Sequence, residues 1–346
     1  MKIFYGIQGT GNGHITRGRI MARELEAANL EVTYQFTGRP HDKFFDMEIF
    51  RGYQWRQGLT FSTRNGKIDR LDTIFQSNPL GLLKDIRQLD LRSYDVVICD
   101  YEPITAWAAR RQQKKTIGIS HQYAFQYQIP RAGTDPISEA VMRNFAPVDI
   151  GIGLHWHHFD QPILPPVIET PIQPKHIQKN KIVVYLPFED QQHVMKLLSP
   201  FKAFEFFIFS PDDVTSCYPN IHCRPLSLLG FQQNLSNCAG IICNAGFELA
   251  SEALQLGKKI LVKPVHAQME QTSNAAALQI LGYGKMMHTL DNQMIEQWLY
   301  ESNAIQIIYP NTAKYLVQWI ADGMPPIDST WYRQIWADVK VITIDD

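Results

Sequence analysis

A glycine-rich stretch near the N-terminus, GTGNGHITR at residues 9–17, directly follows a short apolar run. Glycines let the backbone approach a ligand closely, and the helix expected to start near His14 would point free amides and its positive dipole end at that ligand. A tight turn alone would explain the glycines but would leave the histidine without a role. The glycine spacing also differs from the G-x-G-x-x-G pattern of dinucleotide-binding loops. The stretch therefore predicts a substrate-binding loop in which Gly11, Asn12, Gly13 and His14 face the ligand.

A second segment, residues 242–278, combines a strand, a glycine turn, a helix, a second strand, a loop and a second helix. A helix that starts after Gly246, with Phe247 as its first residue, offers backbone amides and a dipole end to a diphosphate without a metal ion. Glu252 follows on the same, otherwise apolar helix, where its carboxylate could accept hydrogen bonds from a pair of hydroxyls. The alternative for Glu252 is an exposed charge on the helix surface.

Asp100 ends an apolar strand, DVVICD at residues 95–100. A carboxylate in that place could hold His14 in one tautomer and stabilise its imidazolium, as an orienting acid does for a catalytic histidine. Glu102 is a second acid that could take this role. The alternative for Asp100 is a cap on the helix that follows, and the sequence is equally compatible with both.

Three further residues are candidates for contact with an acceptor substrate. His121 follows the next strand, where it could equally be an ordinary loop histidine. Arg56 and Arg64 lie in a basic and aromatic segment, residues 51–70, that could meet an anionic acceptor or a lipid headgroup, although such runs are more often solvated. The HWHH run at 155–158 lacks acidic or cysteine partners at ligand spacing, so we expect a solvated or linker-packed role and no metal site.

Strand-like and helix-like segments alternate along the whole chain, which is the pattern of parallel sheets with right-handed crossovers. A proline-rich stretch between residues 160 and 180 suits neither a helix nor a central strand and separates two halves. We predict an α/β protein of two doubly wound, parallel-sheet domains that face a shared cleft: residues 1–160, a linker at 161–180, residues 181–325, and a helical tail at 326–346. Strands are expected at 2–7, 31–36, 95–100, 116–120 and 148–153, then at 181–187, 205–210, 240–244 and 259–264, with early helices near 14–28, 71–90 and 102–113.

The composition of the chain excludes some classes of binding partner. The formal net charge of −1 and the isoelectric point near 6.8 provide no basic field for nucleic acid. No apolar stretch is long enough to span a bilayer, and the N-terminus lacks the features of a secretory signal, so we expect a cytoplasmic location. The five cysteines form no Cys-x-x-Cys pair, which indicates reduced packing residues.

The two motifs together resemble those of the inverting nucleotide-sugar glycosyltransferases with two facing Rossmann-like domains, the GT-B architecture. This group contains the UDP-glycosyltransferases and the lipid-linked N-acetylglucosaminyltransferase of peptidoglycan synthesis. The resemblance covers most of the chain in layout, but in motif only residues 7–18 and about 240–282. The chain departs from the UDP-glycosyltransferases at Asn244 and Ala245, where histidine and cysteine are usual. It also departs at Glu248, whose carboxylate would repel a diphosphate unless turned away.

The resemblance implies a role for each matched residue. In that group the histidine of the first loop acts as a base, which assigns this role to His14. A glutamate six residues after the glycine turn holds the donor ribose, which matches Glu252. An acid–glutamine pair and a following asparagine bind hydroxyls of the donor sugar, which matches Glu270, Gln271 and Asn274.

These assignments predict sugar transfer with inversion. His14 would deprotonate an acceptor hydroxyl while the nucleoside diphosphate of a UDP-sugar leaves toward Gly246. A retaining enzyme of this architecture would be expected to show two glutamates eight residues apart, whereas Glu248 and Glu252 are four apart. We expect a nucleotide sugar as the only co-substrate, no cofactor or metal, and no nucleic acid. The acceptor is unidentified, and an anionic or lipid-linked acceptor with peripheral membrane contact is compatible with the sequence. A nucleotide-sugar epimerase and a non-catalytic nucleotide-sugar-binding protein stay open as alternatives.

Overall fold

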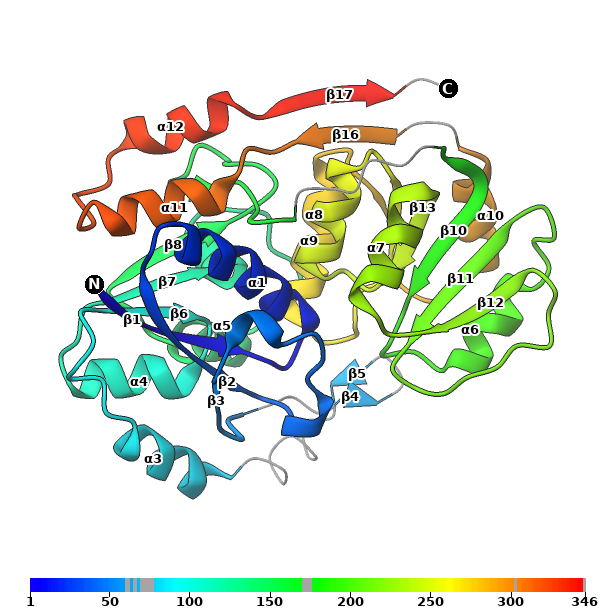
Figure 1. Ribbon diagram of the computed structural model, residues 1–346. Coiled ribbons are helices and arrows are strands. Elements are labelled where there is room, and N and C mark those ends of the chain that lie inside the picture. The colour runs from blue at the N-terminus through cyan, green and yellow to red at the C-terminus, as the bar shows by residue number, and fades with distance from the viewer. Residues whose placement is uncertain (60–62, 65–66, 69–77, 170–175, 302–303, 345–346) are drawn as a thin grey trace.

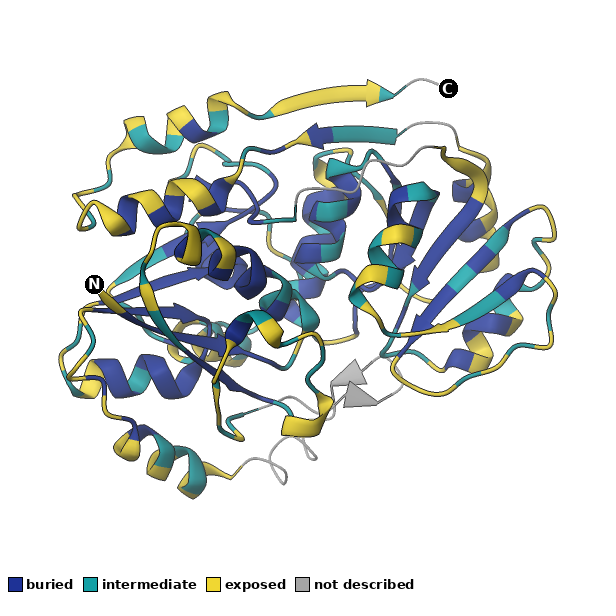
Figure 2. Ribbon diagram, in the orientation of Figure 1, coloured by how far each residue is buried: buried dark blue, intermediate teal, exposed yellow. Residues whose placement is uncertain are grey.

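The computed structural model describes residues 1–59, 63–64, 67–68, 78–169, 176–301 and 304–344. The chain forms two α/β domains, each with a parallel sheet at its centre and helices packed against it (Figure 1). This confirms the predicted fold class of two doubly wound parallel-sheet domains. The central strands of both sheets are buried (Figure 2), because helices cover a parallel sheet on both faces.

The first domain is built on a seven-stranded sheet in the order β3-β2-β1-β6-β7-β8-β9. The strand order reverses between β1 and β6, since the chain continues from β1 to β2 on one side and returns to β6 on the other. Ligands of open α/β sheets bind beyond the carboxyl ends of the strands at such a switch point. The strands are β1 (Lys2–Gln8), β2 (Glu31–Thr37), β3 (Gln54–Trp55), β6 (Val96–Asp100), β7 (Thr116–Ser120), β8 (Ile150–Leu154) and β9 (Ile163–Leu164).

The helices of the first domain pack on both faces of this sheet. Helix α1 covers one face through Ile15 and Met21, and α4 covers the other through Ile104. A short antiparallel hairpin, β4 (Thr63–Arg64) and β5 (Lys67–Ile68), lies apart from the main sheet. The helices are α1 (Asn12–Ala27), α3 (Pro79–Gln88), α4 (Pro103–Arg111) and α5 (Pro136–Asn144), with short 3-10 turns η1 (His41–Lys43), η2 (Glu48–Phe50) and η3 (His121–Gln126).

The second domain carries a six-stranded parallel sheet in the order β12-β11-β10-β13-β14-β15. Its strand order reverses between β10 and β13, so the loop after Tyr185 and the turn at Asn244 lie at the second switch point. The strands are β10 (Gln178–Tyr185), β11 (Glu205–Ser210), β12 (Ile221–Pro225), β13 (Cys238–Cys243), β14 (Lys259–Val262) and β15 (Lys285–Met286). The helices are α6 (Gln191–Leu198), α7 (Leu228–Asn237), α8 (Phe247–Gln255), α9 (Met269–Ile280) and α10 (Asn292–Tyr300).

The C-terminal segment returns to the first domain (Figure 1). After β16 (Ala304–Ile308), helix α11 (Thr312–Ala321) packs against α1. Helix α12 (Ser329–Ala337) reaches β9, where the Trp336 indole N–H donates to the carbonyl oxygen of Ile163 at 2.7 Å. The tail predicted as helical at 326–346 then ends in β17 (Lys340–Ile344), which pairs antiparallel with β16.

The chain thus crosses between the domains twice, and both crossings are bonded to neighbouring residues of α1. On the first crossing, the Glu169 carboxylate pairs with the guanidinium of Arg23. On the second, the Asn311 amide donates to the carboxylate of Glu24 at 2.7 Å. The two crossings therefore lie together beside the C-terminal half of α1.

Several expected elements differ from the structure at their boundaries. The stretch expected to be a linker contains the short strand β9, and β10 already begins at Gln178. Of the helix expected at 71–90, α3 is described from Pro79, while residues 71–77 lie outside the described residues. The sequence does not predict the short edge strands β3, β12 and β15, because two to five residues are too few for a clear periodic signal.

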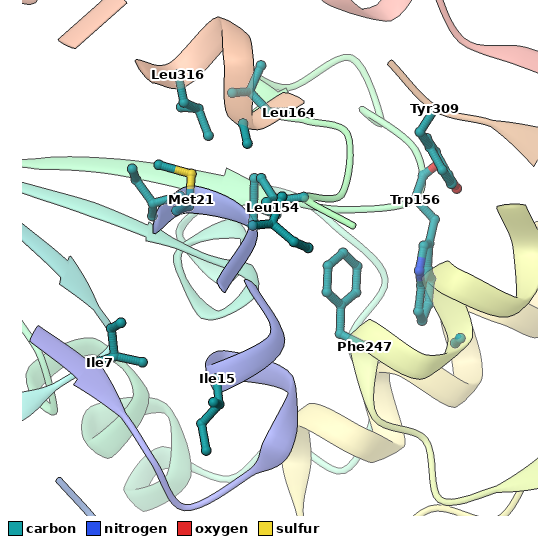
Figure 3. Close-up of a cluster of buried hydrophobic side chains, with 14 of the residues drawn as sticks. Ile7, Ile15, Met21, Leu154, Trp156, Leu164, Phe247, Tyr309 and Leu316 are labelled. Atoms are coloured by element: carbon teal, nitrogen blue, oxygen red, sulfur yellow. The ribbon is translucent and has the colours of Figure 1, made fainter. Parts of the chain in front are cut away.

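One hydrophobic core runs through both domains (Figure 3). Ile7 and Leu154 from the first domain, Phe247 from the second and Leu316 from α11 belong to the same buried cluster. Trp156 lies within it and donates its indole N–H to the Ser251 hydroxyl at 2.8 Å. The two domains are therefore packed against each other.

Candidate active site

The switch point of the first sheet brings His14 and Asp100 together. In the sheet, Ile7 of β1 is paired with Asp100 of β6, and His14 lies in the first turn of the helix that follows β1. The His14 Nδ1 atom is 2.7 Å from Oδ1 of Asp100. A carboxylate at Nδ1 favours the tautomer that keeps its proton there, which leaves Nε2 with a lone pair able to accept a proton.

Asp100 is fully buried and charged in this arrangement. Burial alone would raise the pKa of its carboxyl group, but the charges and hydrogen bonds of Arg17 and His14 outweigh it and hold the pKa below its usual value. The alternative role of Asp100 as a helix cap is filled by Glu102, whose carboxylate accepts from the backbone amides of Ile104 and Thr105 at 2.8 and 2.7 Å. Asp100 is thus free to bond with His14.

Arg17 is a member of this site that sequence reasoning missed. It lies one turn after His14 on α1, and its side chain is almost fully buried. Its Nε and Nη2 atoms donate to the two carboxylate oxygens of Asp100 at 2.8 and 2.6 Å, a bidentate pair. Its Nη1 atom donates to Oε1 of Glu248 in the second domain. The sequence signal that could have identified Arg17 is its charge on the buried, apolar side of an amphipathic helix, where an unpaired arginine is rarely found.

The glycines of the two motifs divide into two kinds. Gly11, before α1, and Gly246, before α8, border open space, since a Cβ atom at either would meet no heavy atom within 4 Å. Gly13 instead packs against the second domain, where a Cβ atom would lie 2.7 Å from Cγ of Glu248. Asn12 also reaches across, donating to the hydroxyl of Tyr185 at 3.2 Å. The first loop therefore contacts the second domain directly.

Glu248 is turned toward Arg17 of the first domain, with which it forms an ion pair. Its side chain is buried, and burial raises the pKa of its carboxyl group to about 7, although the Arg17 charge opposes this shift. The repulsion that the sequence predicts between a diphosphate and Glu248 is thus reduced by a partner from the other domain.

Glu252 lies one turn further along α8 and is half buried, so it is no exposed surface charge. Burial, with the nearby charges of Glu248 and Glu169, raises the pKa of its carboxyl group to about 8. None of the residues that the structure describes forms a hydrogen bond or ion pair with this group. Its predicted role toward the donor ribose stays a prediction.

The predicted donor-sugar residues of α9 are engaged within the protein. Gln271 accepts from the backbone amide of Val265 at 2.9 Å, and the Asn274 amide donates to the carbonyl oxygen of Ala245 at 3.0 Å. Glu270 accepts from the side-chain amide of Gln122 at 3.0 Å, across the domain interface. Their contacts with a donor sugar stay predictions.

His121 is a buried residue of the domain interface rather than a loop histidine. Its ring stacks on Phe247 with centroids 4.1 Å apart, its Nδ1 bonds with the carbonyl oxygen of Leu154 at 2.8 Å, and its Nε2 bonds with Oδ1 of Asn274 at 2.6 Å. Burial lowers the pKa of this histidine. Both ring nitrogens are therefore engaged within the protein, which leaves neither for the acceptor contact considered for His121.

The other acceptor and metal candidates lie elsewhere. Arg56 is held in the first domain by Gln35 at 2.9 Å and Asp85 at 3.0 Å, and the side chain of Arg64 lies outside the described part of the chain. Within the HWHH run, His155 is buried among aromatic rings. Across the described ranges, no group of three or more histidine, cysteine, aspartate or glutamate side chains could hold a metal ion. In the same ranges no helix is long and apolar enough to cross a bilayer.

Comparisons with known proteins agree with this fold. A family model described as glycosyl transferase family 1 matches residues 1–302. The glycotransferase of kitacinnamycin superposes with a TM-score of 0.57 at 14% identity, covering 97% of this chain and 95% of that one. The spinosyn rhamnosyltransferase superposes with a TM-score of 0.58 at 13% identity, covering 94% and 96%. The glycosyltransferase VinC, solved in complex with dTDP, superposes with a TM-score of 0.54 at 12% identity, covering 94% and 96%. No protein of curated function matches the sequence.

Proposed function

We propose a mechanism on the premise that the chain belongs to glycosyl transferase family 1 and is a sugar-transferring enzyme. In this mechanism His14 is the base of an inverting transfer from a nucleoside-diphosphate sugar. The observation that carries this proposal is the hydrogen bond between His14 and the buried Asp100 at the switch point of the first sheet. The second motif, at the start of α8, contacts α1, the helix that carries His14, through the ion pair of Arg17 with Glu248.

In the proposed reaction, Nε2 of His14 takes the proton of an acceptor hydroxyl. The oxygen attacks the anomeric carbon of the donor sugar, a new carbon–oxygen bond forms, and the bond to the diphosphate breaks with its electron pair on the leaving group. Asp100 stabilises the imidazolium that forms. The backbone amides and dipole of α8, which begins beside the open space at Gly246, would stabilise the departing diphosphate.

Inversion is supported by the arrangement of the carboxylates. A double displacement needs a nucleophile that is free to bond with the sugar, and neither carboxylate that contacts Arg17 is free, because Glu248 is paired with Arg17 and Asp100 is fully buried against His14 and Arg17. A single in-line attack by the acceptor needs only the base. It produces the opposite configuration at the anomeric carbon.

UDP is the nucleotide that the motif resemblance favours for the donor. A second candidate is dTDP, because a glycosyltransferase of the same fold has been solved in complex with it. Calorimetry with UDP, dTDP, GDP and ADP separates these candidates without knowledge of the acceptor. A protein that binds none of the four would contradict the proposed function.

The role of His14 predicts the effect of its removal. His14→Ala should lower the rate of nucleotide release by about 100-fold or more while leaving the affinity for the nucleotide nearly unchanged, because a positioned base acts in the transition state. The measurement is UDP or dTDP release from the matching nucleotide-glucose with a panel of alcohol and phenol acceptors. His193→Ala, which changes an exposed histidine on α6, is the control. An unchanged rate would remove His14 from the base role, and an epimerised nucleotide sugar in place of a glycoside would reassign the reaction.

We further propose that turnover needs no divalent metal, because the start of α8 supplies the positive potential at the leaving group. The rate in excess EDTA should stay within about twofold of the untreated rate. Loss of activity in EDTA that magnesium or manganese restores would show that a metal ion takes this role.

A further inference from the structure

The carboxylate that orients His14 is already neutralised by an arginine. Both oxygens of Asp100 accept from Arg17, at 2.8 and 2.6 Å, and the same Oδ1 atom is 2.7 Å from Nδ1 of His14. The Nη2 atom of Arg17 is itself only 2.8 Å from that ring nitrogen. An ion pair of no net charge stabilises an imidazolium far less than a lone carboxylate does. Within the first domain alone, His14 would therefore be a weak base.

Glu248 of the second domain changes this balance. Its Oε1 atom accepts from the third donor nitrogen of Arg17, so that two carboxylates face one guanidinium. Burial would lower the pKa of Arg17, but Asp100 and Glu248 raise it, so the guanidinium stays charged. The pKa of the Glu248 carboxyl group is about 7, so above this pH the group is ionised and the network carries one net negative charge beside the ring of His14.

Among the described residues, the other titratable groups near the network form no hydrogen bond or ion pair with Arg17. Burial raises the pKa of Tyr5 in β1 and of Cys99 in β6 and lowers the pKa of His121 in η3, which keeps all three neutral near pH 7. Glu270 of α9 is bonded to Gln122, and Glu252 of α8 is one turn beyond Glu248. Glu248 is thus the carboxylate in direct contact with Arg17 from the second domain.

The position of Glu248 is costly, which argues against a purely stabilising role. Among the described residues its Oε2 atom is buried without a hydrogen-bond partner. A buried carboxylate that is only half paired destabilises a fold relative to an apolar side chain. Its approach to α1 also requires the absence of a side chain at Gly13.

We propose that Glu248 is a positioning residue that makes His14 a competent base, so that the second domain completes the catalytic charge network of the first. This inference rests on the proposed role of His14. It makes the basicity of His14 depend on contact between the domains at Arg17 and Glu248.

Substitutions of Glu248 and Arg17 should act in opposite directions. Glu248→Gln removes a negative charge, so His14 should protonate at a pH about 1 unit lower, and the plateau rate should fall about tenfold because the base is weaker. Arg17→Met removes the positive charge, so His14 should protonate at a pH about 1 unit higher. NMR titration of the histidine rings measures both shifts, and His14→Gln identifies the signal.

The matched control for these titrations is a carboxylate on α1 that lies away from Arg17. Glu24→Gln removes an α1 carboxylate that also contacts the C-terminal half of the chain, through Asn311, and it should leave the His14 midpoint unchanged. If Glu248→Gln does not fold, Arg17→Met still tests the proposal with the opposite sign. A midpoint that stays in place in both variants, or moves the same way in both, overturns it. The titration needs no donor or acceptor, so its result stands apart from any failure to detect sugar transfer.

Discussion

The carboxyl group of Glu252 is half buried on α8, near the charges of Glu248 and Glu169, and its pKa in the folded protein is about 8. An unfolded glutamate has a pKa near 4.3, so between these values the folded state binds a proton that the unfolded state releases. The raised pKa contributes stability that is fully present below pH 4.3 and is lost as the pH rises through 8. A glutamine side chain at this position does not ionise, so it causes no such loss of stability as the pH rises.

We therefore expect Glu252→Gln to gain free energy of unfolding relative to the unsubstituted protein as the pH rises from 5 to 8, by about 1 to 3 kcal/mol. Urea denaturation at the two pH values measures the difference. Glu26→Gln, on the exposed side of α1, should show no such trend. A parallel pH dependence in all three proteins would mean that Glu252 is ionised in the folded state.

The sequence predicted individual site residues where a chemically suitable side chain stands at the end of a strand or the start of a helix. The histidine after a glycine loop and the aspartate at the end of a buried strand predicted two groups that the structure brings within 2.7 Å. The contact of Arg17 with Glu248 joins residues 231 positions apart on separate domains. No local pattern encodes such a pairing, because it depends on how the two domains are placed against each other.

Among the elements, α12 shows how the C-terminal segment holds the first domain. Trp336 donates to the backbone of β9 and packs edge-on against His158 with ring centroids 5.4 Å apart, while Trp331 on the same helix faces Trp319 of α11. Trp336 thus docks α12 onto the first sheet, whereas Trp331 packs α12 against α11.

We expect Trp336→Ala to release β9 from protection while the rest of the first sheet stays intact, because an edge strand of two residues depends on its neighbours. Hydrogen exchange of a peptide covering Ile163 and Leu164 should rise about tenfold or more, which corresponds to about 1.4 kcal/mol of lost local stability. Trp331→Ala serves as the control and should leave that peptide protected. Equal exposure in both variants would place the effect in the tail as a whole.

Helices with strong periodicity and strands with long apolar runs could be predicted from the sequence, whereas short edge strands could not. The strands β1, β6, β7 and β10 match apolar runs, because both faces of a central parallel strand are buried. The last strand, β17, is largely exposed and pairs with β16 in a two-stranded sheet, whereas the sequence predicts a helical tail there. The helical spacing of Trp331 and Trp336 is realised in α12, and the strand that follows depends on its tertiary pairing with β16.

For the whole molecule, the alternation of strands and helices predicted two parallel-sheet domains, and the strand order supplies the two switch points at which the motifs lie. How the domains face each other could not be read from one sequence. That arrangement rests on a shared apolar core and on buried polar pairs such as His121 with Asn274, whose partners lie 153 residues apart.

The two chain crossings, bonded to Arg23 and Glu24, together act as a single pivot beside one end of α1. His14, the proposed base, lies near the other end of that helix, about 14 Å away at 1.5 Å per residue. A rotation of about 10° about the pivot would move the end that carries His14 by about 2 Å, which exceeds the tolerance of a hydrogen bond. A small rotation of α1 about the pivot would therefore displace the helix most at His14.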